Sequence, residues 1–196
     1  MKSTDLLFNQ LSYEIANPIS DVFWRIFTLL GDTEALAVVS VLLVAFLLWQ
    51  KKIQEIILYL VLMASGILLT LGLKLTFQKE RPGEVEYIDF LGFGKDIVSY
   101  SFPSGHAVKS LLMLGFIIWF IRKNYRKNKY TFITTRLLLM AIVLCGIGQI
   151  FLHEHYLSDV IGGYLIGSTI QFYFLWIYYF WLNRQEQSKI PSRKIQ

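Results

Sequence analysis

Two polar residues at the start of an apolar segment have the types and spacing of a reactive pair. His155 precedes Asp159 by four residues, so the two side chains would share one face of a helix. A carboxylate placed there can accept a hydrogen bond from one imidazole nitrogen and leave the other nitrogen free as a nucleophile. The bland alternative is a simple polar start to a helix. The spacing therefore predicts an oriented histidine nucleophile.

A second cluster, Ser101-Phe-Pro-Ser104-Gly105-His106, opens directly into another apolar segment. Ser104 can cap that helix, and Gly105 allows a ligand to approach the backbone closely. The free N–H groups of a helix start form an anion site. His106 can donate a proton there at neutral pH. The alternative is a Pro-Ser-Gly turn that carries an incidental histidine.

A third cluster follows a long apolar segment, with Lys74 separated from Arg81 by six residues and Pro82 ending any helix. The alternative is that these cations extend to the headgroups from a helix end.

Taken together, the three clusters predict phosphoryl transfer through a phosphohistidine, because two cations and a helix start neutralise phosphate charge and an acid protonates the leaving oxygen. No Asp/Glu cluster points to a metal, and His153 and His155 would diverge on a helix, so we expect no metal or cofactor.

The composition predicts an all-α integral membrane protein. Of the 196 residues, 55% are hydrophobic and only 17% are charged, and the basic residues lie in short loops between apolar runs, which argues against nucleic-acid binding. The runs are continuous, which excludes an alternating barrel pattern. Cys145 lies inside such a run and is expected to be inert. The predicted spans, each near the roughly 20 residues that a bilayer requires, are about 34–50, 53–76, 105–121, 132–152 and 158–182.

The N-terminal segment 4–30 mixes large apolar with charged residues and is broken at Pro18, so we expect residues 1–33 to form two interfacial amphipathic helices and not a signal peptide. The whole chain, 1–196, is predicted to form a single domain that ends in a tail at 184–196. Eleven cations lie in one set of loops and six in the opposite set. This asymmetry predicts a cytoplasmic C-terminus and an extracytoplasmic site in the plasma membrane.

The three clusters resemble the type 2 phosphatidic acid phosphatase family, the lipid phosphate phosphatases, over roughly residues 30–182. The family pattern is Lys-x6-Arg-Pro, then Pro-Ser-Gly-His, then Ser-Arg-x5-His-x3-Asp, and the first two motifs are intact. The resemblance implies no metal. It implies that His155 is the nucleophile, that Asp159 orients it and that His106 is the acid. The implied phosphate ligands are Lys74, Arg81, Ser104 and Gly105.

The third motif departs from the family pattern, because Gln149 stands where the family has Arg and Gly148 stands for Ser. Glutamine can donate hydrogen bonds to phosphate but carries no charge. Losing one charge-assisted contact costs roughly 2–4 kcal/mol of transition-state stabilisation. Either Lys109, on the same helix face as His106, or His153 could supply the missing charge.

The expected reaction is hydrolysis of a lipid phosphate or pyrophosphate, with undecaprenyl pyrophosphate, phosphatidylglycerol phosphate and phosphatidic acid as open candidates. The expected partners are this substrate and membrane lipids. Two alternatives remain: a lipid phosphotransferase, and a degenerate lipid-binding or lipid-moving protein, for which Gln149 is the sequence feature. Vanadate-dependent haloperoxidases carry the same motifs, but they are soluble, and the predicted spans argue against that class.

Overall fold

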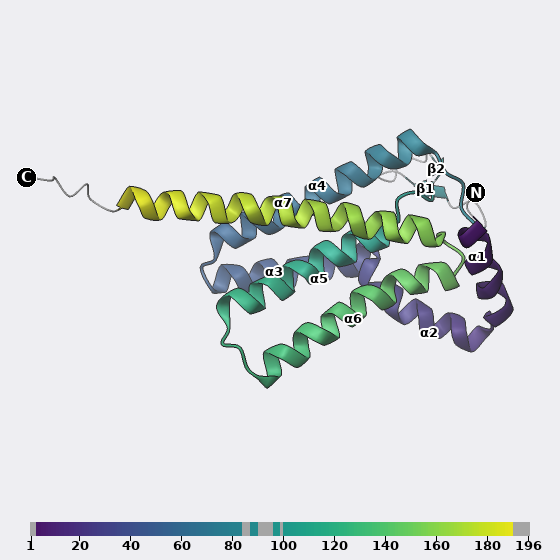
Figure 1. Cartoon of the computed structure of the whole chain (residues 1–196), viewed down its shortest axis with the longest axis horizontal. Coiled ribbons are helices and arrows are strands. Elements are labelled where there is room, and N and C mark those ends of the chain that lie inside the picture. The colour runs from purple at the N-terminus through teal and green to yellow at the C-terminus, as the bar shows by residue number, and fades with distance from the viewer. Residues whose placement is uncertain (1–2, 84–86, 90–95, 99, 190–196) are drawn as a thin grey trace, which may run out of the picture.

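The fold is a bundle of helices, obtained as a computed structural model that describes residues 3–83, 87–89, 96–98 and 100–189. Its first part contains two short helices and a 3-10 turn that precede a longer helix (Figure 1). The elements in chain order are α1 (Ser3–Ile15), α2 (Pro18–Thr28), η1 (Leu29–Gly31), α3 (Thr33–Trp49), α4 (Ile53–Phe77), β1 (Tyr87–Asp89), β2 (Asp96–Val98), α5 (Gly105–Asn124), α6 (Lys129–Phe151) and α7 (Leu157–Lys189).

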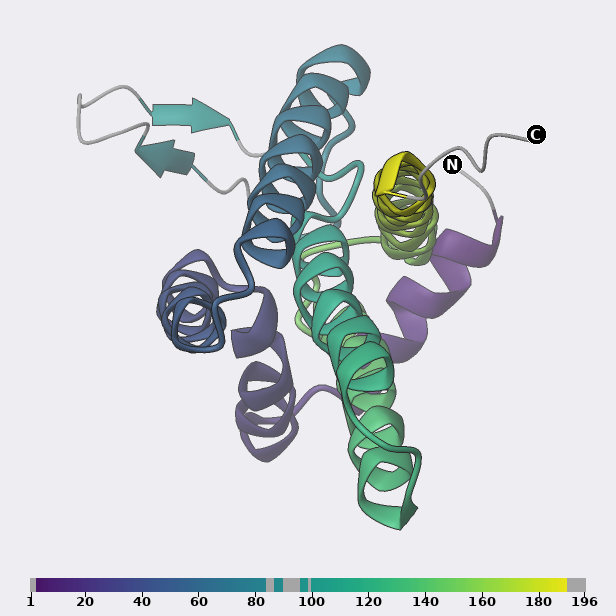
Figure 2. The ribbon, with the colours of Figure 1, turned by 90° about the vertical axis from the view of Figure 1, so that its left-hand side faces the viewer.

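Helix α5 is the central element and packs against α4, α6 and α7 (Figure 2). Its side chains Leu112 and Phe116 are fully buried, and the Phe116 ring lies 5.0 Å from the ring of Tyr59 on α4. Most of the buried apolar residues belong to this one cluster. The core therefore fixes α5, whose first turn carries His106, relative to α4 and α7.

Among the described residues, four helices are long and apolar enough to cross a membrane: α4, α5, α6 and α7, the last over Leu157–Gln187. Their outer faces expose large apolar side chains, such as Leu68 and Phe172, as lipid-facing helices do. The expected helical membrane bundle is confirmed. The short antiparallel pair β1–β2, with Ile88 opposite Ile97, adds a small ribbon between α4 and α5 that the sequence pattern did not predict.

The predicted span 34–50 corresponds to α3, which begins at Thr33 and ends at Trp49. α3 alone is slightly too short to count as a candidate membrane span. It becomes one when it is joined to residues 18–31, although the two parts are bent by 47° relative to each other. The expected break at Pro18 is present, since α1 ends at Ile15 and α2 starts at Pro18 with Asn17 as its cap. The interfacial position of α1 and α2 stays a prediction.

The two ends of the bundle differ in what they carry (Figure 1). The connections 50–52 and 125–128 lie at the end toward which α7 runs out to the C-terminus. The N-terminal helix, the β1–β2 ribbon and the α6–α7 turn lie at the opposite end. The cation-rich loops are thus separated from the three motif clusters, as expected. Which end faces the cytoplasm stays a prediction.

Candidate active site

His155 lies in the turn between α6 and α7 and is buried, with 2% of its surface exposed. Because α7 begins only at Leu157, the expectation that His155 and Asp159 share one helix face is wrong in detail. The two side chains still face each other, with His155 Nδ1 at 4.0 Å from Asp159 Oδ2. The backbone N–H of His155 donates to the carbonyl of Gln149 at 3.1 Å, which closes the turn onto the end of α6.

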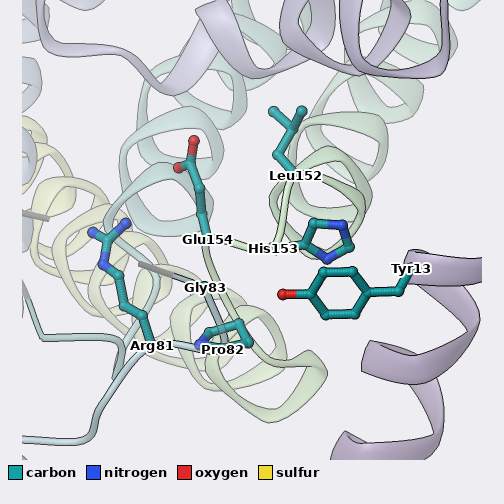
Figure 3. A pocket seen from close by; sticks show the side chains of 7 residues that line it. All are labelled: Tyr13, Arg81, Pro82, Gly83, Leu152, His153 and Glu154. Atoms are coloured by element: carbon teal, nitrogen blue, oxygen red, sulfur yellow. The ribbon is translucent and has the colours of Figure 1, made fainter. Parts of the chain in front are cut away.

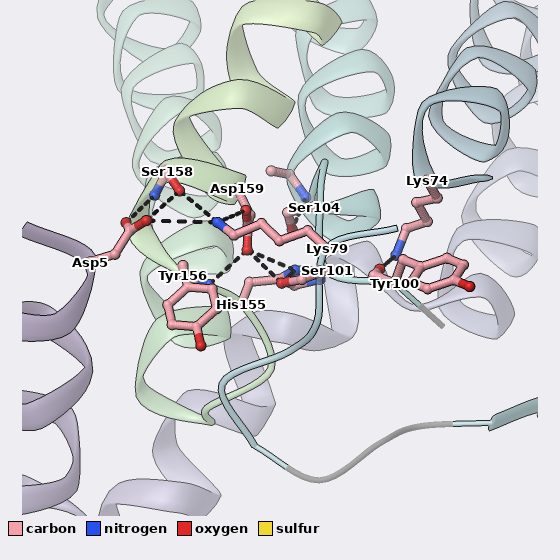
Figure 4. Close-up of polar contacts among 11 residues, drawn as sticks. Asp5, Lys74, Lys79, Tyr100, Ser101, Ser104, His155, Tyr156, Ser158 and Asp159 are labelled. Carbon is pink, nitrogen blue, oxygen red and sulfur yellow. Dashed lines mark hydrogen bonds and ion pairs between the residues drawn. The ribbon is translucent and has the colours of Figure 1, made fainter. Parts of the chain in front are cut away.

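Ser101 connects this histidine to its carboxylate, a role that its position in the sequence does not predict. Its hydroxyl donates to Asp159 Oδ2 and lies 3.3 Å from His155 Nδ1, and its backbone N–H donates to the carbonyl of Lys79 at 2.7 Å (Figure 4). The available signal was the position of a serine directly before the Phe-Pro-Ser-Gly-His run. Since Nδ1 faces Ser101 and Asp159, Nε2 is the ring nitrogen available to a substrate.

The carboxylate of Asp159 is fully buried and accepts hydrogen bonds from several donors. Lys79 Nζ donates to Oδ1 at 2.7 Å, and the backbone N–H of Tyr156 donates to Oδ2 at 3.0 Å. A buried carboxylate is tolerated when such partners replace water. Lys79 was counted in the sequence only as a loop cation, so its contact with the candidate orienting residue is new.

The start of α5 is held directly against the start of α7. Ser104 caps α5, its hydroxyl accepting from the N–H of Ala107 at 3.4 Å, while its own N–H donates to the backbone carbonyl of Asp159 at 3.1 Å. A side chain at Gly163 would place its Cβ 2.8 Å from the carbonyl oxygen of Ser104, so only glycine permits this approach. The second and third motifs are therefore in contact through the backbone.

A pocket of about 420 Å³ brings together predicted residues from each of the three motifs. Its lining includes polar groups from the three motifs and an apolar wall from α3 and α4. Ser104, Gln149 and Asp159 were also predicted for the site but are not part of this lining. Lys74 Nζ also donates to the carbonyl of Tyr100. The lining residues are Asp32, Thr33, Leu36, Ile67, Thr70, Leu71, Lys74, Arg81, Gly105, His106, Lys109 and His155.

His106 has a carboxylate partner that the sequence did not indicate. Its Nε2 lies 2.7 Å from Asp32 Oδ1, at the bend between η1 and α3. The same bend packs closely against the histidine, because a Cβ at Gly31 would lie 2.6 Å from His106 Cδ2. Asp32 precedes an apolar helix and therefore looks like an ordinary helix cap, so no local signal points to His106.

The environment of His155 favours its neutral, nucleophilic form. Burial is the main cause and the positive charges of Arg81 and Lys74 add to it, so that the pKa of His155 is held well below its usual value of 6.5. A neutral imidazole at physiological pH is what a nucleophilic histidine requires.

Gln149 is fully buried, and neither atom of its amide has a hydrogen-bond partner among the described residues. Of the two cations expected to compensate for it, Lys109 lines the pocket of the motif residues and donates from Nζ to Thr33 Oγ1 at 3.1 Å. His153 is not part of that lining. The geometry thus places Lys109, and not His153, beside the candidate phosphate ligands.

His153 points instead into a second pocket, of about 500 Å³, which Figure 3 shows. Its ring stacks on Tyr13 of α1 with 3.7 Å between ring centroids, and its Nδ1 lies 3.1 Å from Ser12 Oγ. Arg81 lines this pocket as well as the first. No cluster of three or more His, Cys, Asp or Glu suited to a metal occurs in the part of the chain that the structure describes.

This arrangement of fold and motifs is that of the PAP2 superfamily, whose family model matches residues 55–185, and the chain belongs to this family. It is 26% identical over 176 residues to phosphatidylglycerophosphatase B of Bacillus subtilis (strain 168). The aligned region covers 88% of this chain and 82% of that protein.

Two crystal structures share the fold. A transmembrane PAP2-type phosphatidylglycerolphosphate phosphatase from Bacillus subtilis superposes with a TM-score of 0.74 at 22% identity, over 97% of this chain and 88% of that chain. Aquifex aeolicus LpxE superposes with a TM-score of 0.64 at 23% identity, over 89% of this chain and 99% of that chain.

Proposed function

We propose that the protein is a membrane lipid phosphatase that works through a phosphohistidine on His155. The observation that carries the proposal is the composition of one pocket. Its polar side combines Lys74 and Arg81 with the first turn of α5 and both motif histidines, while Leu36, Ile67 and Leu71 form an apolar wall. Cations and a helix N-terminus suit a phosphate, and the apolar wall suits the lipid part of the same molecule.

In the first half-reaction, Nε2 of neutral His155 attacks phosphorus, and the bond between phosphorus and the lipid oxygen breaks. His106 donates a proton to the departing oxygen, and the lipid alcohol leaves. Asp159 and Ser101 hold the Nδ1 side of His155, so the phosphorylated ring faces a carboxylate when it becomes positively charged.

In the second half-reaction, water attacks the phosphohistidine, His106 accepts the proton of that water, and inorganic phosphate is released. Asp32 positions His106 through the contact with Nε2. Lys74 and Arg81, with the N–H groups around Ser104 and Gly105, neutralise the oxygens of the transferred group. Gln149 adds a neutral amide where the family pattern has a guanidinium.

Among the candidate substrates, phosphatidylglycerol phosphate is the first to test, because the curated relative and one of the similar crystal structures carry that substrate in their names. Phosphatidic acid presents the same kind of phosphate monoester. Undecaprenyl pyrophosphate presents a terminal phosphate on a second phosphate, so its leaving group in the first half-reaction would be the lipid monophosphate and not a lipid alcohol. We place the site on the extracytoplasmic side, on the basis of the uneven distribution of loop cations.

Purified protein in detergent micelles should release inorganic phosphate from at least one of these three lipids, and His155→Ala should abolish the release. Rapid quenching should trap a phosphoenzyme that is labile in acid and stable in alkali, absent from His155→Ala and present in a slow His106→Ala variant. Transfer of the phosphate to an added alcohol in place of water would identify a phosphotransferase. Lipid binding without turnover by the wild type would identify the degenerate alternative that Gln149 favours.

A further inference from the structure

The N-terminal helix α1 holds both ends of the turn that carries His155. Ser12 and Tyr13 contact His153 on one side of the turn. On the other side, the carboxylate of Asp5 accepts from the N–H of Ser158 at 3.0 Å and from its hydroxyl at 2.7 Å. The nucleophile candidate thus lies between two attachment points of one helix.

Asp5 is an unusual residue for a helix that is predicted to be interfacial, because only 4% of its surface is exposed while its neighbours Leu6 and Leu7 are half exposed. A buried carboxylate is costly unless it is paired. Asp5 binds the first turn of α7, where unpaired N–H groups and the positive end of the helix dipole favour an anion. The leucines of α1 are exposed, whereas the Asp5 side chain points toward Ser158 and Lys79.

Lys79 lies between two carboxylates. Its Nζ is 2.7 Å from Asp159 Oδ1 and 3.7 Å from Asp5 Oδ2, and it also donates to Ser158 Oγ at 2.9 Å (Figure 4). It belongs to the six residues that separate Lys74 from Arg81, yet it is absent from the lining of the pocket that both of them share. Its charge is therefore directed at the carboxylate behind the nucleophile.

We propose that Lys79, held by Asp5 of α1, is a positioning residue that fixes the carboxylate of Asp159 so that it orients His155. Lys79 binds Oδ1, which leaves Oδ2 turned toward Ser101 and His155. With Oδ2 fixed, the proton of the neutral ring stays on Nδ1 and Nε2 stays free. Without Lys79, the carboxylate can rotate, and its charge is left with fewer partners in a buried site.

The inference rests on the proposed function, and kinetics test it first. Lys79→Met should lower kcat about 10–100-fold while KM stays within about threefold, because the contact acts on the nucleophile and not on substrate binding. Lys79→Arg, which keeps the cation, should retain at least about a third of wild-type kcat. Asp5→Asn should lower kcat about 3–10-fold. Because Asp5→Asn preserves the shape of the side chain, it tests the same contact should Lys79→Met fail to fold.

Lys52→Met is a matched control, since Lys52 also donates from Nζ to an oxygen, that of Asn124 at 3.0 Å, but at the opposite end of the bundle. Its kcat should equal that of the wild type. A rise in KM at unchanged kcat in Lys79→Met would overturn the inference, because Lys79 would then bind substrate. Wild-type kinetics in Lys79→Met would overturn it equally.

A second measurement separates this inference from the proposed function. The chain has three histidines, so ¹⁵N-histidine NMR spectra in micelles can be assigned with single His→Gln variants. In the wild type, His155 should be neutral with its proton on Nδ1, and Lys79→Met should convert it to a mixture of tautomers. An unchanged His155 signal in Lys79→Met would refute the positioning role even if the wild type hydrolyses no lipid phosphate. A shift of the His155 signal to a mixture of tautomers would support the positioning role, whether or not the wild type hydrolyses a lipid phosphate.

Discussion

Replacing Gln149 by methionine separates the stability of the fold from the function of the site. The two side chains are similar in size, so the substitution removes the amide without opening a cavity. The amide is fully buried, and both of its polar atoms lack a partner among the described residues. Such a group destabilises the protein unless a ligand completes its hydrogen bonds.

The substitution should raise the stability of the protein and lower its activity. Leaving a buried polar group unsatisfied costs about 1–3 kcal/mol, so Gln149→Met should be more stable than the wild type by about that amount. For a chain of this length, the Tm should rise by about 2–12 °C. A hydrogen bond to a charged group contributes about 1.5–3 kcal/mol. If the amide donates to the phosphoryl group, kcat/KM should fall by about 10–150-fold.

The assay combines thermal unfolding in detergent with initial rates on a lipid phosphate. Gln171→Met is the matched control, because Gln171 also has a buried amide oxygen without a partner but lies on α7 about three turns beyond Asp159. It should leave kcat/KM unchanged. A Gln149→Met variant that is less stable than the wild type would refute the reasoning about the unpaired amide. Unchanged kcat/KM in that variant would remove Gln149 from the phosphate site.

Three further predictions concern charge and orientation. Lys109→Ala should lower kcat/KM by about 100-fold, and Gln149→Arg should restore activity in that background, since a cation again reaches the phosphate; wild-type rates in Lys109→Ala would end the idea of compensation. In intact cells, an impermeant thiol reagent should label a single cysteine at Glu80 and not one at Lys127, in a background without the native cysteine, and the reverse labelling would invert the orientation. Burial, and then the nearby cations, lower the pKa of His155, so the ring should stay neutral as pH falls through 6.5. Quench-flow should therefore show that the phosphoenzyme still forms at more acidic pH. Loss of phosphoenzyme formation at or above pH 6.5 would contradict the lowered pKa.

The positions of the helices follow from local pattern, which is why the sequence predicted them closely. The start of α5 at Gly105 is set by the cap at Ser104. The end of α4 at Phe77 follows the last apolar residues before the polar run that leads to Pro82. Helix starts and apolar runs depend on residues adjacent in the chain, so one sequence is enough to locate them. The side chains of the three motifs lie together because these same helix ends meet at one end of the bundle.

The partners of those side chains could not be predicted in the same way. Lys79 and Asp159 are distant in sequence, and only the packing of the α4–α5 connection on α7 brings them within 2.7 Å. Ser101 and Asp32 are likewise polar residues at ordinary turn or cap positions. Their contacts with the two histidines depend on how separate helices dock, which the hydrophobic pattern of each helix does not determine.

The N-terminal segment shows most clearly how the docking of separate helices determines the surroundings of the site. Asp5 and Asp32 both lie outside residues 55–185, the part of the chain that matches the family model. Yet Asp5 pairs with the lysine behind the nucleophile, and Asp32 contacts the candidate acid His106. The two histidines need opposite protonation states in the first step, and their carboxylates are arranged differently: Asp32 contacts Nε2 of His106 at 2.7 Å, whereas Asp159 is bound to Lys79 and lies 4.0 Å from His155. A carboxylate already paired with a lysine stabilises a charged imidazolium less strongly, so Asp159 can orient the neutral ring of His155 without favouring a second ring proton. The segment that looks from sequence like a surface attachment therefore supplies a carboxylate to the surroundings of each candidate histidine: Asp32 beside His106 and Asp5 beside Lys79.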